Sequence, residues 1–300
     1  MKIIKLQRFC LNGFMSFLVA LLILIIFPSS PSWASSGVEA TANRDEVSGI
    51  ERIKERNSLN VAVFFEDVPP FFMHNKQKAF VGVDVELAQD IAKRLGVAIK
   101  FDRSPKTFDA VVDTVVTGKA DVAISLLSDT LNRAVKVRFS DSYVALRQTL
   151  LINRLNLAQQ FSSVQDVTQI RNLLNQAEIK LGVISGTSYV DFVKADYPLA
   201  TVVMYDDFPT MIEELQAGKI FALLYDELEI MNWRYENPSG GLRFKTVLLS
   251  DRKDTIAFAV NRDNEDLLVW LNLYLEKIKG EGMLDKLLHN YLEQNNWRTQ

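Results

Sequence analysis

The stretch that decides the fold comprises residues 118–143 and reads GKADVAISLLSDTLNRAVKVRFSDSY. It begins with a Gly-Lys turn and continues into a short apolar run at 121–125, which is typical of a strand covered on both faces. Ser125 and Ser128 lie at or just beyond the carboxyl end of that strand, and Arg133 follows after a turn. Ligands of open α/β sheets bind beyond the carboxyl ends of the strands. We therefore expect a binding site here.

The chemistry of these three side chains indicates a site for a small anion. Arg133 carries a planar fork of N–H donors that can hold a carboxylate through two hydrogen bonds. Ser125 and Ser128 add hydroxyl donors at its side. The alternative is an arginine that simply follows a surface turn, because short motifs of this kind also occur by chance.

A second copy of this design lies 100 residues further along the chain. Residues 109–125 and 209–226 both read as a helix with an apolar face, a Gly-Lys stop and an apolar strand. The first copy ends at Ser125, beside hydrogen-bond donors, whereas the second ends at Asp226, an acceptor. One unit could bind a carboxylate and the other an ammonium group, and an amino acid carries both.

These features resemble those of the family 3 extracellular solute-binding proteins, which serve polar amino-acid ABC transporters. The resemblance covers about residues 49–296, and its marks are the segments 81–95, 125–143, 185–189 (SGTSY), 225–227 (YDE) and 267–284. It implies an α/β protein with the two-lobed, type II periplasmic-binding-protein fold. Each lobe would contain a mostly parallel sheet flanked by helices, and the ligand would be captured in the cleft between them by hinge closure.

The resemblance also implies a binding role for residues of both lobes. Asp226 would hold the amino group of the ligand. Phe108 would contact the ligand side chain. Phe65 and Glu66 are expected beside it from their place near the cleft edge of lobe one, where Glu66 and Asp67 could favour a cationic side chain unless they only belong to a solvated loop. The ligand carboxylate would be bound by a set of donors that comprises Arg133, Ser128, Ser125, Thr187, Ser188 and Gly186.

Two positions argue against part of this assignment of roles. Ser188 is followed three residues later by Asp191, which is a variant of the capping box, so we expect the Ser188 side chain to cap the helix that follows. Leu126 stands where many members of the resembling family have a glycine or serine that helps to seat the amino group. The ligand could therefore be a carboxylate without a standard α-amino group.

The first 34 residues have the features of a secretory signal peptide. Three basic residues precede an apolar core at 14–27, and the segment ends with the small-residue exit Ser32-Trp33-Ala34. The core has 14 residues, fewer than the roughly 18 that a membrane span requires. We expect cleavage after Ala34 and release into the periplasm, with an uncleaved anchor as the alternative. The single cysteine, Cys10, would be removed with the signal, so no disulfide is expected.

Charge and length limit the partners and the domain organisation. Removal of three of the 34 basic residues leaves 31 against 37 acidic side chains, a net charge of −6, which argues against nucleic acid as a partner. We expect a monomer that docks on a membrane permease. The predicted organisation is a signal at 1–34, a flexible tether at 35–48, a discontinuous lobe one at 49–146 and 252–300, and lobe two at 147–251.

The pattern of apolar residues predicts alternating helices and strands. Helices are expected at 50–56, 84–95, 108–117, 164–176, 189–195, 211–216, 265–279 and 283–294. Strands are expected at 59–64, 98–103, 121–125, 180–184, 201–205 and 221–225, and the β-rich stretches 147–153 and 243–260 would cross between the lobes.

Enzyme motifs are missing from the sequence. It contains no nucleophile elbow, P-loop, dinucleotide fingerprint or zinc-protease motif, and His74 and His289 are too far apart in sequence to indicate a metal or triad pair. We expect no catalytic residue, no cofactor and no metal. Two alternatives remain: a periplasmic prephenate or arogenate dehydratase on the same fold, in which Asp226 or Glu227 would be the general acid, and a ligand-sensing protein.

Overall fold

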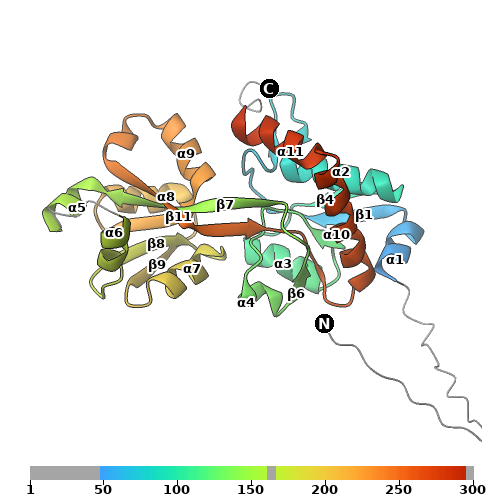
Figure 1. The fold of residues 1–300 in the computed structure, drawn as a ribbon, viewed down its shortest axis with the longest axis horizontal. Coiled ribbons are helices and arrows are strands. Elements are labelled where there is room, and N and C mark those ends of the chain that lie inside the picture. Colours follow the sequence, from blue (N-terminus) through green and yellow to red (C-terminus); the bar gives the residue numbers. More distant parts are fainter. Residues whose placement is uncertain (1–47, 161–166, 295–300) are drawn as a thin grey trace, which may run out of the picture. The chain divides into compact units, whose positions relative to one another are not determined.

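The computed structural model describes residues 48–160 and 167–294, which form two five-stranded sheets flanked by helices (Figure 1). The strand order is β4-β1-β5-β12-β6 in the first sheet and β11-β7-β10-β8-β9 in the second. This arrangement confirms the predicted two-lobed α/β class. The expected signal peptide and almost all of the tether lie outside the described residues.

The first sheet combines strands from both ends of the chain. Its centre, β5 (Val122–Ala123), pairs in parallel with β1 (Ser58–Ala62), which in turn pairs in parallel with β4 (Ala98–Asp102). On the other side β5 pairs antiparallel with β12 (Ala259–Asn261), and β12 pairs antiparallel with β6 (Val137–Phe139). The helices of this lobe are α1 (Gly49–Glu55), α2 (Val83–Leu95), α3 (Phe108–Val116), α4 (Leu131–Ala134), α10 (Glu265–Gly280) and α11 (Met283–Leu288).

The second sheet has a similar mixed arrangement and is formed by the middle of the chain. Strand β8 (Lys180–Ile184) pairs in parallel with β9 (Thr201–Tyr205) and with β10 (Ala222–Asp226). Residues Ala222, Leu223 and Leu224 are all buried, as expected of a strand covered on both faces. The helices here are α5 (Arg154–Gln160), α6 (Val167–Leu174), α7 (Tyr189–Asp196), α8 (Phe208–Gln216) and α9 (Glu227–Glu236).

Two long strands run side by side between the two groups of elements (Figure 1). They are β7 (Val144–Asn153) and β11 (Phe244–Ile256), whose antiparallel pairing extends from Val144 opposite Ile256 to Asn153 opposite Phe244. The register shifts between Leu249 and Lys253, which marks an irregularity in the ladder. Bulges of this kind bend a strand and redirect the side chains beside it.

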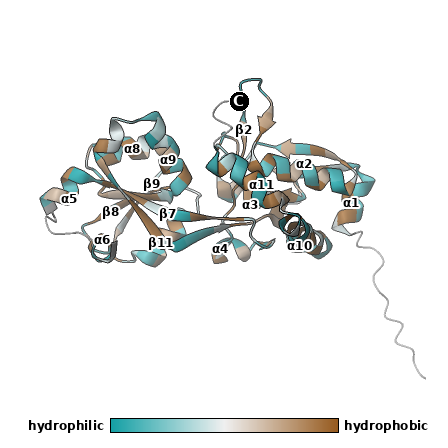
Figure 2. Ribbon diagram, turned by 45° about the horizontal axis from the view of Figure 1, so that its top comes forward, coloured by the Kyte–Doolittle hydropathy of each residue, from teal (hydrophilic) through white to brown (hydrophobic). Residues whose placement is uncertain are grey.

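Buried apolar residues form one cluster around the first sheet and two around the second. Hydrophobic residues (brown) and hydrophilic residues (teal) alternate along the helices in Figure 2, as expected for helices with one buried face. Within residues 48–160 and 167–294, no helix combines the length and the apolarity needed to cross a membrane.

Several predicted elements differ from the structure. The helix expected at 283–294 ends as an α-helix at Leu288 and continues as a π-helical turn over His289–Glu293. Helix α9 was not expected, because it lacks a clear apolar stripe and buries only Ile230. The sheets are mixed rather than mostly parallel, since each has two parallel and two antiparallel pairings among the described strands. The antiparallel pairings come from the strands that cross between or return to the lobes.

Candidate functional site

The ends of both repeated units meet at one pocket, which we call the inner pocket. The loop after β5 contributes Leu126 and Ser128, helix α4 contributes Arg133, and the end of β10 contributes Tyr225 and Asp226. The whole lining consists of Phe108, Leu126, Ser128, Arg133, Leu146, Thr187, Ser188, Tyr189, Tyr225, Asp226 and Asp254. Six of the ten residues expected at the site line this pocket, and Gly186 lies beside it, bonded to Arg133. The six are Arg133, Ser128, Thr187, Ser188, Asp226 and Phe108.

Arg133 is held in a fixed position by its neighbours. Helix α4, which carries it, is capped by the Thr130 side chain, and the Arg133 residue is only 6% exposed. Its Nε and Nη2 donate to Asp109 Oδ1 at 3.1 and 3.0 Å, and Nη1 donates to the Ser128 carbonyl at 3.3 Å. Asp109, which the sequence analysis did not single out, therefore orients the fork from the solvent side.

The hydroxyl groups of Ser128 and Ser188 join the two lobes. Their Oγ atoms are 2.8 Å apart, and Ser128 Oγ lies 2.9 Å from Asp254 Oδ2. The expectation that the Ser188 side chain caps α7 is wrong, because that side chain makes no capping hydrogen bond. It is turned toward Ser128 instead, so its hydroxyl faces the pocket.

Two other residues expected to donate hydrogen bonds to the ligand have side chains that bond backbone groups of the protein instead. Ser125 is fully buried, does not line the inner pocket, and accepts a hydrogen bond from the Phe64 amide at 2.9 Å. Thr187 does line the pocket, but its hydroxyl donates to the Ile184 carbonyl at 2.7 Å. Both side chains fix the backbone of the strand ends that form the site.

Gly186 allows the lobes to approach each other closely. Its φ is +70°, a conformation that favours glycine. Its carbonyl accepts hydrogen bonds from the Asp109 amide at 3.1 Å and from Arg133 Nη2 at 3.4 Å. A Cβ atom on Gly186 would lie 2.7 Å from the Thr107 Cβ in the other lobe, so any other residue would push the lobes apart.

Asp226 lies at the boundary between β10 and α9, where it is both the last residue of the strand and the N-cap of the helix. It is 6% exposed, and its Oδ1 accepts the Glu229 amide at 2.8 Å as the N-cap of α9. Burial raises the pKa of Asp226 to about 6, although the backbone amides of the cap lower it. A cation beside this carboxylate would favour its charged form.

Leu126 occupies a backbone conformation that is unusual for its type. Its φ is +49°, and its amide donates to the buried Asp84 carboxylate at 2.6 Å, so this N–H group is not available to a ligand. The Leu126 side chain lines the inner pocket without offering a polar atom. Asp84 also accepts the Tyr143 hydroxyl at 2.7 Å, which ties the turn to the core.

A second pocket, which we call the outer pocket, shares Phe108, Thr187 and Tyr225 with the inner one. It contains the other two residues expected near the ligand side chain, Phe65 and Glu66. Five carboxylates line it, and the single basic side chain among its lining residues is Lys106, whose Nζ lies 3.9 Å from the centre of the Phe65 ring. The acidic residues are Glu66, Asp67, Asp206, Asp207 and Glu229.

The carboxylates of the outer pocket differ in their surroundings. Asp67 is paired with Arg103 at 2.9 Å, and Asp207 caps α8 through the Thr210 amide at 2.7 Å. Burial, together with repulsion from Asp226, raises the pKa of Glu229 to about 8. A cation beside Glu229 would favour its charged form.

The sequence model for bacterial extracellular solute-binding proteins, family 3, matches residues 61–294. The chain belongs to this family. The proteins of this family and the curated relatives are solute-binding proteins, not enzymes.

The relatives of this solute-binding protein bind several amino acids. The L-cystine-binding protein TcyJ of Escherichia coli K12 is 25% identical over 287 residues, 96% of each chain. The lysine/arginine/ornithine-binding periplasmic protein of the same organism is 26% identical over 233 residues, 75% of this chain and 84% of that one. Among solved structures, the substrate-binding protein AbpA from Streptococcus pneumoniae, bound to L-arginine, covers 80% of this chain and 97% of its own, with 28% identity and a TM-score of 0.64.

Four acidic residues of the two pockets were not found by sequence reasoning. Asp206, Asp207 and Glu229 follow strand ends, and Glu229 lies three residues after Asp226, so their position was a signal that could have been used. Asp254 was harder to recognise, because the sequence shows there only an acidic residue shortly before an apolar run on the returning stretch. Its place in the inner pocket of this solute-binding protein depends on the pairing of β11 with β7.

Proposed function

We propose that this solute-binding protein captures an amino acid with a cationic side chain for an ABC transporter. The observation that carries the proposal is the excess of carboxylates in the outer pocket, where five acidic residues accompany Lys106 alone. Like charges close together in a partly buried site repel one another, and a bound cation relieves that repulsion. An acidic ligand side chain would increase it. The arginine-bound AbpA and the lysine/arginine/ornithine-binding protein support the same class of ligand.

In the two pockets, the carboxylate, the α-ammonium group and the side chain of the ligand would each have separate partners. The carboxylate would bind Arg133 and the hydroxyls of Ser128 and Ser188, where charge-assisted hydrogen bonds are the strongest available. The α-ammonium group would bind Asp226. The side chain would pass Phe108 and Tyr225 into the outer pocket and place its charge near Glu229 and Glu66.

Hinge closure would complete the site. The inner pocket is nearly filled by its own side chains, and the Ser128–Ser188 and Asp109–Gly186 hydrogen bonds hold the lobes together. A ligand of amino-acid size therefore needs the lobes to separate before it can enter. Rotation about β7 and β11, the pair of strands that joins the two sheets, would allow this.

We further propose the partner and the location of the protein. The closed, ligand-bound form would dock on a membrane permease as a monomer. The expected signal at 1–34 would direct export, and the mature chain would begin at Ser35 in the periplasm. Lobe one would comprise 49–146 and 252–300, with 147–251 as lobe two.

A thermal-shift screen of the mature protein tests the proposed ligand class. Lysine, arginine and ornithine are expected to raise the melting temperature, since a ligand at 100 times its dissociation constant adds about 2.7 kcal/mol of stability. Glutamate and aspartate are expected to give no shift. A shift with neutral or acidic amino acids alone would reject the cationic class while leaving the solute-binding function in place.

The pH dependence of binding is the second test. Because the pKa values of Asp226 and Glu229 are raised in the folded protein to about 6 and about 8, their contribution to stability is present below about pH 4 and is lost as the pH rises through 6 to 8. A cationic ligand lowers these pKa values, so its binding releases protons. We expect affinity to increase from pH 5 to pH 8, by at most about tenfold per pH unit for each proton released. Calorimetry in two buffers of different ionisation enthalpy would detect that release, and proton uptake would contradict the expectation.

A further inference from the structure

Asp254 is a buried acidic residue of the inner pocket whose hydrogen-bonding capacity is only half used. It is 3% exposed, and its Oδ2 accepts a hydrogen bond from the Ser128 hydroxyl at 2.9 Å. Its Oδ1 is fully buried and, like the Tyr189 hydroxyl beside it, has no hydrogen bond of good geometry within the part of the chain that the structure describes, although the two groups lie close enough to interact. A buried carboxylate oxygen without a donor is costly, so such a group generally has a partner that completes it.

The surroundings of Asp254 indicate what kind of partner is missing. Burial and repulsion from the Asp226 carboxylate raise the pKa of Asp254 to about 7, although the Ser128 hydroxyl, the Arg133 guanidinium and the Tyr189 hydroxyl lower it. Among the residues that line the inner pocket, two carboxylates therefore accompany one arginine, and that arginine is already paired with Asp109. The inner pocket thus has an excess of negative charge that a cation would neutralise.

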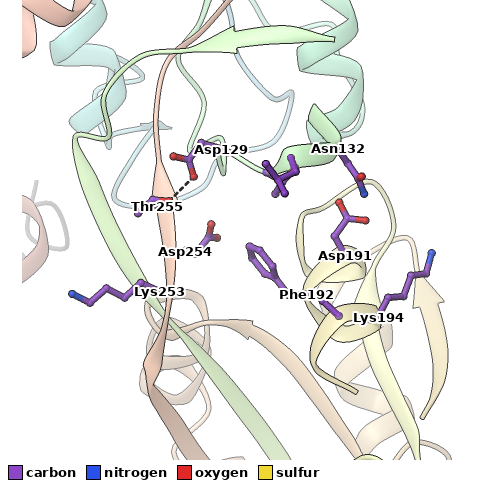
Figure 3. Close-up of a pocket in the computed structure, with 11 residues that line it drawn as sticks. Asp129, Asn132, Asp191, Phe192, Lys194, Lys253, Asp254 and Thr255 are labelled. Atoms are coloured by element: carbon purple, nitrogen blue, oxygen red, sulfur yellow. Dashed lines mark hydrogen bonds between the residues drawn. The ribbon is translucent and has the colours of Figure 1, made fainter. Parts of the chain in front are cut away.

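The position of Asp254 places it within reach of a ligand. It precedes Thr255, whose hydroxyl bonds Asp129 as Figure 3 shows, so the backbone of β11 is fixed at this point. Its carboxyl group also lines a groove on the side of α7 that contains Phe192 and Asp191, and Figure 3 shows it at the centre of that groove. Asp254 therefore forms the wall between the groove and the inner pocket.

We propose that Asp254 is a specificity-determining residue that shares the α-ammonium group of the ligand with Asp226. An ammonium group has three N–H donors and can donate to both carboxylates at once. The Leu126 side chain offers no polar atom to the inner pocket, whereas Asp254 on β11 supplies a carboxylate. The inference rests on the proposed function only in requiring an α-amino acid as ligand, and it does not depend on the charge of the ligand side chain.

The experiment compares Asp254→Asn with the unchanged protein against two matched ligands. Asparagine keeps the size of the side chain and can still accept the Ser128 hydroxyl, but it carries no charge. The ligands are the amino acid that binds best in the thermal-shift screen and its analogue without the α-amino group, for example lysine and 6-aminohexanoate. Asp251→Asn is the control, since Asp251 lies on the same strand, outside both pockets, and pairs with Arg171 at 2.6 Å. Affinities are measured by calorimetry.

We expect Asp254→Asn to weaken binding of the amino acid about tenfold or more, which is the loss usual for a hydrogen bond to a charged group. Binding of the deamino analogue is expected to change little or to become tighter, because the analogue retains a carboxylate that Asp254 repels. Equal losses for both ligands would overturn the proposal and leave Asp254 with only a structural role through Ser128. If neutral amino acids bind and cationic ones do not, the proposed ligand class fails, but the same comparison still decides the role of Asp254. Binding of no amino acid at all would overturn both.

Discussion

Replacement of Arg133 by lysine is expected to weaken amino-acid binding nearly as much as replacement by alanine. Removal of one partner of a buried charge pair costs about 2–5 kcal/mol, or about 30-fold to several thousand-fold in affinity. Lysine keeps the charge but cannot reproduce the fork that contacts Asp109 and the Ser128 carbonyl and that, in the proposed site, would also hold the ligand carboxylate. Calorimetry with the tightest ligand of the screen measures the loss.

The control for this experiment is Arg138→Ala. Arg138 lies on β6, pairs with Glu265 at 3.4 Å, and lines neither pocket. Its replacement is expected to change stability by less than about 1 kcal/mol and affinity not at all, since exposed ion pairs contribute little. Unchanged affinity in Arg133→Ala, with a circular dichroism spectrum like that of the parent, would remove Arg133 from the site.

Asp226→Asn is expected to discriminate between ligands with and without an α-ammonium group. Asparagine is as good an N-cap as aspartate, so α9 should form normally in this variant. The affinity for amino acids is expected to fall by about 2–5 kcal/mol. Deamino analogues should lose much less, because they never had the ionic partner. Isothermal titration with each pair of ligands provides the measurement.

The same variant tests the dehydratase alternative. A general acid at Asp226 would leave the binding of prephenate or arogenate almost normal and would stop its conversion to phenylpyruvate or phenylalanine. We expect the unchanged protein to produce neither compound, in accordance with its family. Product formation that Asp226→Asn abolishes would refute the assignment as a binding protein.

Capping illustrates how local patterns can mislead at this site. Ser188 and Asp191 have the spacing of a capping box, yet the Ser188 hydroxyl pairs with Ser128 in the other lobe. In contrast, Asp226 was expected to bind the amino group of the ligand or, in the alternative, to act as a general acid, and in the structure it also caps α9. A cap competes with every other partner that the folded chain brings within reach of the same side chain, and those partners are not visible in the local sequence.

The sequence by itself determined the alternation of helices and strands and the repeated helix–turn–strand unit, because apolar periodicity is a local property. Its motifs also resembled a known family, and that resemblance implied the two-lobed fold. The sequence also indicated Arg133 and Asp226, which lie where the two repeated strands end. Only the tertiary structure showed that Asp254 lines the inner pocket, that Asp109 pairs with Arg133, and that Ser125 lies outside the pocket. Asp254 lies 28 residues beyond Asp226, on a strand whose register is fixed by its pairing with β7. Such positions follow from long-range pairing and burial, since the same acid at a shifted register would face solvent.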